Sequence, residues 1–328
     1  MNFFSQLSLQ FRRQFAIKKR DKLATVIVFV IPIILGLMSG MVFLTDDGSG
    51  EYAFWENYQY SEFSFMLIIT SIFLGLLISV VEIIKERHIL EKEKMFGVST
   101  VAYYFAKFFA LIIFSLIQTL LLYSTASYVL EVPPTLFLEN VLILYVVSIN
   151  SVAIGLLISS FAKNLLIAYN LIAIIVLPQL LFGGGFIPFE SMSHKLKFFD
   201  EPKSARMPFI GKMLPAAWAY EDMMVSNYVT TKAWKKNVAL EYFEVKRKPL
   251  DDYMSKDKSV NIGGFKVNIA TSIYNKLVLA MESFALILIT LGVLRQSHLA
   301  YFDLIISINK TGRMSRSANN ENIIKITE

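Results

Sequence analysis

The chain has 328 residues, of which 55% are hydrophobic and 18% are charged, and its mean hydropathy is +0.53. Soluble domains contain about 45–50% apolar and about 25% charged residues, so this composition argues against a soluble enzyme. No cysteine is present, which excludes disulfides and thiol nucleophiles. In a soluble protein the net charge of +6 would suggest binding to nucleic acid. In a membrane protein, the position of the basic residues must be considered first, because it indicates which side of the membrane each connection lies on.

Residues 1–22 are expected to form an elbow helix that lies flat at the membrane surface. Phe4, Leu7, Phe11 and Phe15 recur every three or four residues, and arginines and lysines supply the water-facing side. A basic flank that only sets the orientation of the first span would have a similar composition, so both interpretations stay open.

Six apolar segments approach the length of about 20 residues that a membrane-spanning helix needs. They are residues 23–44, 63–84, 101–123, 141–162, 165–182 and 277–294. Short connections rich in lysine and arginine lie on the cytoplasmic side. Six basic residues lie in residues 1–22 and four in residues 82–100, whereas residues 45–62 contain none. We therefore expect both termini in the cytoplasm and an integral protein of the bacterial inner membrane.

The connection at residues 82–100 mixes charges of both signs and has high helical propensity up to Phe96. Gly97 and the hydroxyl residues after it are typical of a helix end just before the next span. We expect a short helix held against the membrane face. An ordinary solvated hairpin would have the same composition.

Polar side chains within the spans are the next candidates for function. Asn150 and Asn170 are uncharged. Such side chains within membrane spans commonly form hydrogen bonds between helices. The alternative is that they line a transport pathway. Glu282 is ionisable, which makes it a functional candidate. Because the apolar run after it is short, we expect Glu282 at the outer headgroup level.

The fifth span contains Pro178 and is followed directly by the glycine run GGGF. Irregular backbone at membrane depth is tolerated only when it is buried in protein or lines a cavity, so a re-entrant or gate-like turn is expected. A plain helix end is the alternative. Residues 183–276 then form a large external segment with 15 basic residues, in which alternation at residues 238–245 predicts one or two strands.

Motifs for catalysis or metal binding are absent from the sequence. No GxxxxGK[ST], HExxH or GxSxG pattern occurs, and the three histidines lie in three different connections. We therefore expect no enzyme activity, no catalytic residue and no metal site on this chain, and no binding of nucleic acid.

Three stretches resemble permeases of the ABCG-like, type-2 family of ABC exporters. EIIKERHILEKEKMFGVSTVAYYFAK (residues 82–107) resembles the first intracellular loop of that family. LPQLLFGGGFIPF (177–189) resembles its fifth span and re-entrant turn, and LPAAWAYEDMMVSNY (214–228) a helical part of its last external loop. The order of an elbow helix, five spans, an external segment and a sixth span is similar too, so the resemblance covers most of residues 1–294.

The resemblance implies two groups of functional residues. The first would form a coupling helix that receives force from an ATP-binding cassette: Glu86, Arg87, Glu93 and Gly97. The second would lie at the outer gate near a dimer axis: Pro178, Leu181, Phe182 and Phe186. Asn150 and Asn170, singled out above by their polarity, complete the predicted translocation path.

The resemblance also implies partners. A second copy or a paralogue would complete a central cavity, membrane lipids would surround it, and ATP with Mg²⁺ would be bound by an ABC ATPase. Relatives that carry the cassette on the same chain place it before the elbow helix. Because nothing precedes that helix here, we expect the ATPase as a separate subunit or as part of a longer fusion.

The sequence thus predicts an all-α membrane protein with six transmembrane helices, an amphipathic interfacial helix before them, and a large α+β extracytoplasmic loop between helices 5 and 6. The expected divisions are residues 1–22, 23–182, 183–276, 277–294 and a cytoplasmic tail at 295–328. The expected function is the permease subunit of an ATP-driven exporter of lipids, amphiphiles or hydrophobic small molecules. A membrane anchor for a surface assembly, or a carrier or channel without an ATPase, are the alternatives.

Overall fold

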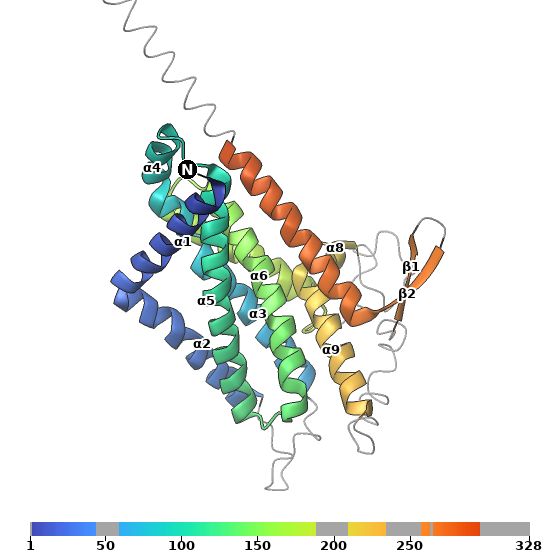
Figure 1. Ribbon diagram of the computed structural model, residues 1–328. Helices are drawn as coiled ribbons and strands as arrows, with labels where there is room; N and C mark the ends of the chain where they lie inside the picture. Colours follow the sequence, from blue (N-terminus) through green and yellow to red (C-terminus); the bar gives the residue numbers. More distant parts are fainter. Residues whose placement is uncertain (1, 44–58, 188–208, 234–256, 263–264, 296–328) are drawn as a thin grey trace, which may run out of the picture.

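The computed structural model describes residues 2–43, 59–187, 209–233, 257–262 and 265–295 (Figure 1). Within these ranges the chain is a bundle of helices with a small antiparallel hairpin. The strands predicted at residues 238–245 and the tail at 296–328 lie outside the described residues.

The labelled elements, in chain order, are α1 (Phe3–Arg20), α2 (Lys22–Val42), α3 (Tyr60–Ser79), α4 (Glu82–Met95), α5 (Thr100–Val129), η2 (Pro134–Leu136), α6 (Phe137–Phe161), α7 (Leu165–Phe182), α8 (Phe209–Lys212), α9 (Pro215–Ala233), β1 (Asp257–Ile262) and β2 (Phe265–Ala270). The chain then continues into a helix at Thr271–Arg295, which we call the C-terminal span. Strands β1 and β2 pair with Val260 opposite Val267.

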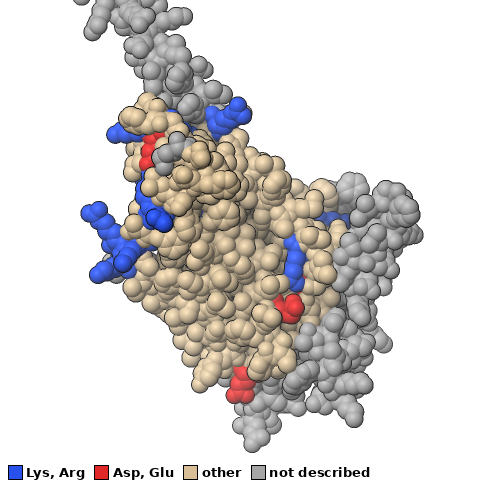
Figure 2. Space-filling view, viewed as in Figure 1, with Lys and Arg blue, Asp and Glu red and all other residues tan. Residues whose placement is uncertain are grey.

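Six helical stretches of the described chain are long and apolar enough to cross a membrane, which confirms the six predicted spans. Local signals start two of them. The side chain of Ser99 accepts a hydrogen bond from the Ala102 amide at the start of α5, and Asn164 does the same for Ile167 at the start of α7. On the face shown in Figure 2, lysines and arginines gather at the α1–α2 corner and around α4. Between the ends of the bundle this face is mostly uncharged, apart from a few charged side chains near the start of the C-terminal span.

Helices α3, α5 and α6 run through the middle of the bundle, with α2 on one flank and the C-terminal span on the other (Figure 1). Helices α1 and α4 lie together at one end, which we call the α4 end. The α5–α6 turn lies at the opposite end, and α9 packs against α3, α6 and α7 in that half of the molecule.

Helices α3 and α6 approach closely through small residues. Every fourth residue of α3 from Ser71 to Ser79, and of α6 from Ser151 to Ser159, is serine or glycine. A Cβ atom added to Gly155 would come within 1.9 Å of the Ser79 hydroxyl oxygen. Small residues at this spacing let helix backbones approach in a membrane, where the hydrophobic effect does not drive helices together.

Replacing Gly155 with leucine should therefore disrupt the bundle. The added side chain has no space between α6 and α3, so we expect a loss at or above the upper end of the roughly 1–3 kcal/mol that overpacking costs. Thermal unfolding and gel filtration of the detergent-solubilised protein measure this. Gly292 in the C-terminal span is the matched control, because an added Cβ there meets no atom within 4 Å of the described chain. Equal behaviour of Gly155→Leu and Gly292→Leu would contradict the packing argument.

Candidate functional site

A buried lysine at the α4 end holds two carboxylates of α4. The Nζ atom of Lys107, in α5, lies 3.0 Å from an Oε2 atom of Glu86 and 3.3 Å from that of Glu82. Only 1% of the Lys107 side chain is exposed. The Tyr103 hydroxyl, one turn before Lys107, donates a hydrogen bond of 3.3 Å to Glu86. Because both glutamates are themselves buried, this lysine neutralises charges that water cannot solvate.

Helix α1 contributes two further cations from its inner face. Arg13 pairs with Glu86 at 3.3 Å and also with Glu93, and Lys18 pairs with Glu82. We define the α4 cluster as these three cations and three carboxylates: Arg13, Lys18 and Lys107 with Glu82, Glu86 and Glu93. The cluster is electrically balanced, and it ties three separate helices into one unit.

The inner face of α1 differs from the one that the sequence predicts. Gln10 and Gln14 are buried, and Gln14 accepts a hydrogen bond of 3.2 Å from Lys107. Phe4, in contrast, is 78% exposed. Arg13 and Lys18, which were expected on the water side, point toward α4, because that helix presents carboxylates with which they pair.

Arg87 holds α4 on its other side. Its Nη2 atom donates hydrogen bonds to the carbonyl oxygens of Ser159, Ser160 and Ala162, at 2.8–3.2 Å. These are the last carbonyls of α6, which lack partners within the helix and carry the negative end of its dipole. Helix α4 is therefore anchored to α6 as well as to α1 and α5.

The turn after α4 requires glycine. Gly97 has a φ of +84°, and its amide donates to the Lys94 carbonyl at 3.0 Å, while the next amide donates to the Glu93 carbonyl at 3.1 Å. This left-handed residue ends the helix in the way that glycine does at a helix C-terminus. The expected helix end at Gly97 is thus present.

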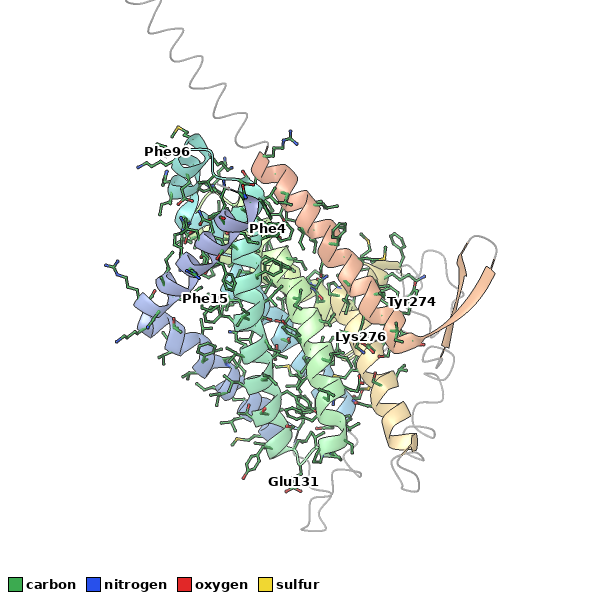
Figure 3. All side chains as sticks on the ribbon, viewed as in Figure 1. Phe4, Phe15, Phe96, Glu131, Tyr274 and Lys276 are labelled. Atoms are coloured by element: carbon green, nitrogen blue, oxygen red, sulfur yellow. The ribbon has the colours of Figure 1, made fainter. Side chains whose placement is uncertain are left out.

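Most of the residues predicted for the coupling helix are held against the rest of the protein. These are Glu86 and Glu93, which pair with cations of the α4 cluster, and Arg87, which contacts α6. The outward face of α4 consists of other residues, which we call the α4 tip: His88, Ile89, Lys92, Met95 and Phe96. Phe96 is 87% exposed and stands at the edge of the molecule (Figure 3). Sequence reasoning missed these residues. The sequence feature that could have indicated them is Phe96, an aromatic residue directly before the helix-ending Gly97.

Helix α7 continues through Pro178 and ends at Phe182, where the chain bends back onto α3. A Cβ atom on Gly185 would lie 2.0 Å from Cγ of Phe65, so this glycine allows the backbone to lie against the ring. Phe186 packs edge-to-face on Phe65 with ring centroids 5.4 Å apart. The predicted break after α7 is therefore confirmed, and its partner is Phe65. Among the other predicted gate residues, Pro178 and Phe182 are half-buried and Leu181 is exposed.

One face of α7 is apolar and uncovered in this chain. Leu166, Ile174 and Leu177 are among its exposed side chains, and the predicted path residue Asn170 is exposed on the same helix. An exposed amide within an apolar span is unfavourable against lipid.

Glu282 lies farther from the start of its helix than the sequence predicts. The C-terminal span begins at Thr271, six residues before the expected start, so Glu282 falls near the middle of Thr271–Arg295. The Asn150 amide nitrogen, in the middle of α6, lies 3.4 Å from a Glu282 carboxylate oxygen and 3.3 Å from the Leu279 carbonyl. Glu282 therefore lies level with the middle of α6, and Asn150 is a hydrogen-bonding partner of the C-terminal span.

Charged residues also join α9 to the start of the C-terminal span. Lys276, which is labelled in Figure 3, lies 3.0 Å from the fully buried Asp222. The neighbouring Asn275 donates a hydrogen bond to Glu221 at 3.2 Å. Burial raises the pKa of Asp222 above that of an ordinary aspartate, and the Lys276 ammonium opposes this shift. The amide of Ala216 at the start of α9 donates to the Gln179 side chain at 3.0 Å. Helix α9 is thus part of the bundle.

In the part of the chain that the structure describes, no three histidine or acidic residues are placed to hold a metal ion. A comparison with curated proteins found no match. A protein-family model described as ABC-2 type transporter matches residues 5–201, which include all but the first two residues of α1, the helices from α2 to α7, the α4 cluster and the turn at Phe186. This match covers more than half of the chain, so the chain belongs to the ABC-2 type transporter family.

Proposed function

We propose that this chain is an ABCG-like permease that works as a dimer, with a separate ABC ATPase that binds ATP and Mg²⁺ and docks on the α4 tip. Membership of the ABC-2 family indicates the membrane-embedded permease subunit of an ABC exporter. In the proposed orientation the α4 end faces the cytoplasm, and the membrane is the bacterial inner membrane. Short basic connections at residues 1–22 and 82–100 support this orientation.

The observation that carries the proposal is the contrast between the two faces of α4. Met95 and Phe96 expose apolar surface beside the basic Lys92, which suits a partner with an apolar groove and an acidic rim. The opposite face is fastened by the α4 cluster and by Arg87 to α1, α5 and α6. A push on the α4 tip would therefore be passed to three helices together.

The uncovered face of α7 supports a dimer. A second copy, or a paralogue, packed near this face would cover Leu166, Ile174 and Leu177 and would place Asn170 in protein or in a central cavity. The turn at Gly183–Gly185 would lie beside the outer end of that cavity. Closure of two ATPases would then switch the cavity from inward to outward access.

The substrate class that we propose is a lipid, an amphiphile or a hydrophobic small molecule. Apolar side chains dominate the spans, and the polar groups among them are mostly asparagine, glutamine, serine and tyrosine. Sites with this composition bind largely apolar ligands and use few polar groups to orient them.

Co-expression tests the proposal. The tagged chain is produced together with each cassette ATPase of the same genome, solubilised in mild detergent and purified by affinity and gel filtration. We expect one ATPase to remain bound at a ratio of one per permease copy, with a hydrolysis rate that differs from that of the free ATPase. Retention of no cassette ATPase by intact, monodisperse permease would overturn the proposal.

A further inference from the structure

A cavity of about 290 Å³ lies beneath the α1–α2 corner, and Ile89 is the one residue of the α4 tip that lines it. Residues of five helices line it, from α1 to α5. Its apolar wall includes Val28, Ile78, Leu111 and Phe114, and its polar part includes Lys18 and Lys85. The cavity is therefore amphipathic, with charged groups and a hydrocarbon-like wall in one space.

The wall of this cavity extends into the depth of the membrane. Val28 is six residues from the start of α2, and Phe114 is fourteen residues from the start of α5. At 1.5 Å per residue, these positions lie about 9 Å and about 21 Å along their helices. The volume is at the lower end of the roughly 300–1,000 Å³ of small-molecule sites, which suits one acyl-chain segment.

The charges around the cavity favour an anionic headgroup. Glu82, Glu86 and Asp21 line the cavity, but Lys18, Lys107 and Arg13 already neutralise the two glutamates. Asp21 lies between Arg20 and Lys22 in the chain, so basic residues outnumber it at this corner. Lys85 is exposed at the cavity, and α1 ends in a basic turn whose remaining members are Lys19 and Arg20, followed by Lys22. Figure 2 shows this basic corner projecting from the molecule. Juxtamembrane basic clusters of this kind attract anionic lipids.

We propose that this cavity is a binding site for one anionic phospholipid of the adjoining leaflet. One acyl chain lies against Val28, Ile78 and Leu111, and the phosphate lies between Lys85 and the basic end of α1. The bound lipid would contact the Lys18–Glu82 pair directly. It would thereby stabilise the position of α1 against α4, which makes the site a means of regulating how α4 is held.

Native mass spectrometry of the delipidated, detergent-solubilised chain tests the site with three probes: dioleoyl phosphatidylglycerol, dioleoyl phosphatidylcholine and dioleoylglycerol. We expect one phosphatidylglycerol bound at least about tenfold more tightly than phosphatidylcholine, and dioleoylglycerol bound more weakly than both. Lys85→Gln should weaken phosphatidylglycerol binding several-fold and leave dioleoylglycerol unchanged. Lys163→Gln is the matched control, because Lys163 is an exposed lysine of the α6–α7 turn outside the cavity lining.

A second variant tests the apolar wall. Leu111→Phe reduces the space for the acyl chain, so it should remove the tight phosphatidylglycerol site while the lipid-free unfolding temperature stays within a few degrees. Equal affinity for phosphatidylglycerol and phosphatidylcholine would overturn the proposal. Unchanged phosphatidylglycerol binding in both Lys85→Gln and the wall variant would overturn it as well.

Discussion

Replacing Phe96 with aspartate should abolish binding of the ATPase to the permease. Phe96 is 87% exposed at the end of α4, so the substitution removes an apolar anchor without disturbing the permease core. Aromatic anchors at protein interfaces contribute at least about 2 kcal/mol, which corresponds to about 30-fold in affinity. The negative charge of an aspartate would also be repelled by the acidic rim of the proposed groove on the ATPase. Retention of the ATPase in the purified complex, and ATP-dependent flux in vesicles, measure the effect.

A matched control exists at the other end of the bundle. Tyr128, near the end of α5, is 85% exposed and is also aromatic, but it lies far from α4. Tyr128→Asp should leave ATPase retention unchanged, whereas Phe96→Leu should retain part of it because the apolar contact is kept. If Phe96→Asp and Tyr128→Asp bind the ATPase equally well, the docking surface lies elsewhere.

Replacing Lys107 with methionine should destabilise the permease more than any other single change in the α4 cluster. Lys107 is the fully buried member, and its removal leaves Glu82 and Glu86 with only the two cations of α1. Breaking a buried ion pair typically costs about 3–5 kcal/mol, because the buried carboxylates lose a positive charge that water cannot replace. Thermal unfolding in detergent should show a loss of several degrees.

Two further variants separate charge from packing at this position. The double variant Lys107→Met with Glu86→Gln removes one buried charge of each sign, so it should recover a large part of the lost stability. Lys19→Met, at an exposed lysine of α1, should unfold at the wild-type temperature. A double variant that is no more stable than Lys107→Met alone would show that the cluster does not act through paired charges.

The position of Glu282 shows where sequence reasoning reached its limit. The predicted sixth span, residues 277–294, begins after the polar stretch from Thr271 to Lys276. The residues of this stretch are helical in the structure, and Asn275 and Lys276 hydrogen-bond or pair with buried acids of α9. Hydropathy cannot detect such an extension, because the partners of these side chains lie about fifty residues earlier in the chain.

Composition and local pattern were sufficient for much of this protein. Long apolar runs determined the six spans, since a helix that crosses the bilayer must be apolar over about 20 residues. Helical propensity followed by Gly97 determined α4 and its end, and the glycine run determined the bend after α7. The motifs around these turns were also enough to recognise the transporter family.

Only the tertiary structure decided which face of each polar helix is covered. Helix α4 carries both charge signs on all sides, so its sequence does not distinguish the inward Glu86 and Arg87 from the outward His88 and Phe96. The distinction depends on Lys107, Arg13 and the end of α6, which the fold brings to α4 from other segments. Burial of a charge is favourable only where an opposite charge or a free carbonyl is already in place, and that is a property of the assembled bundle.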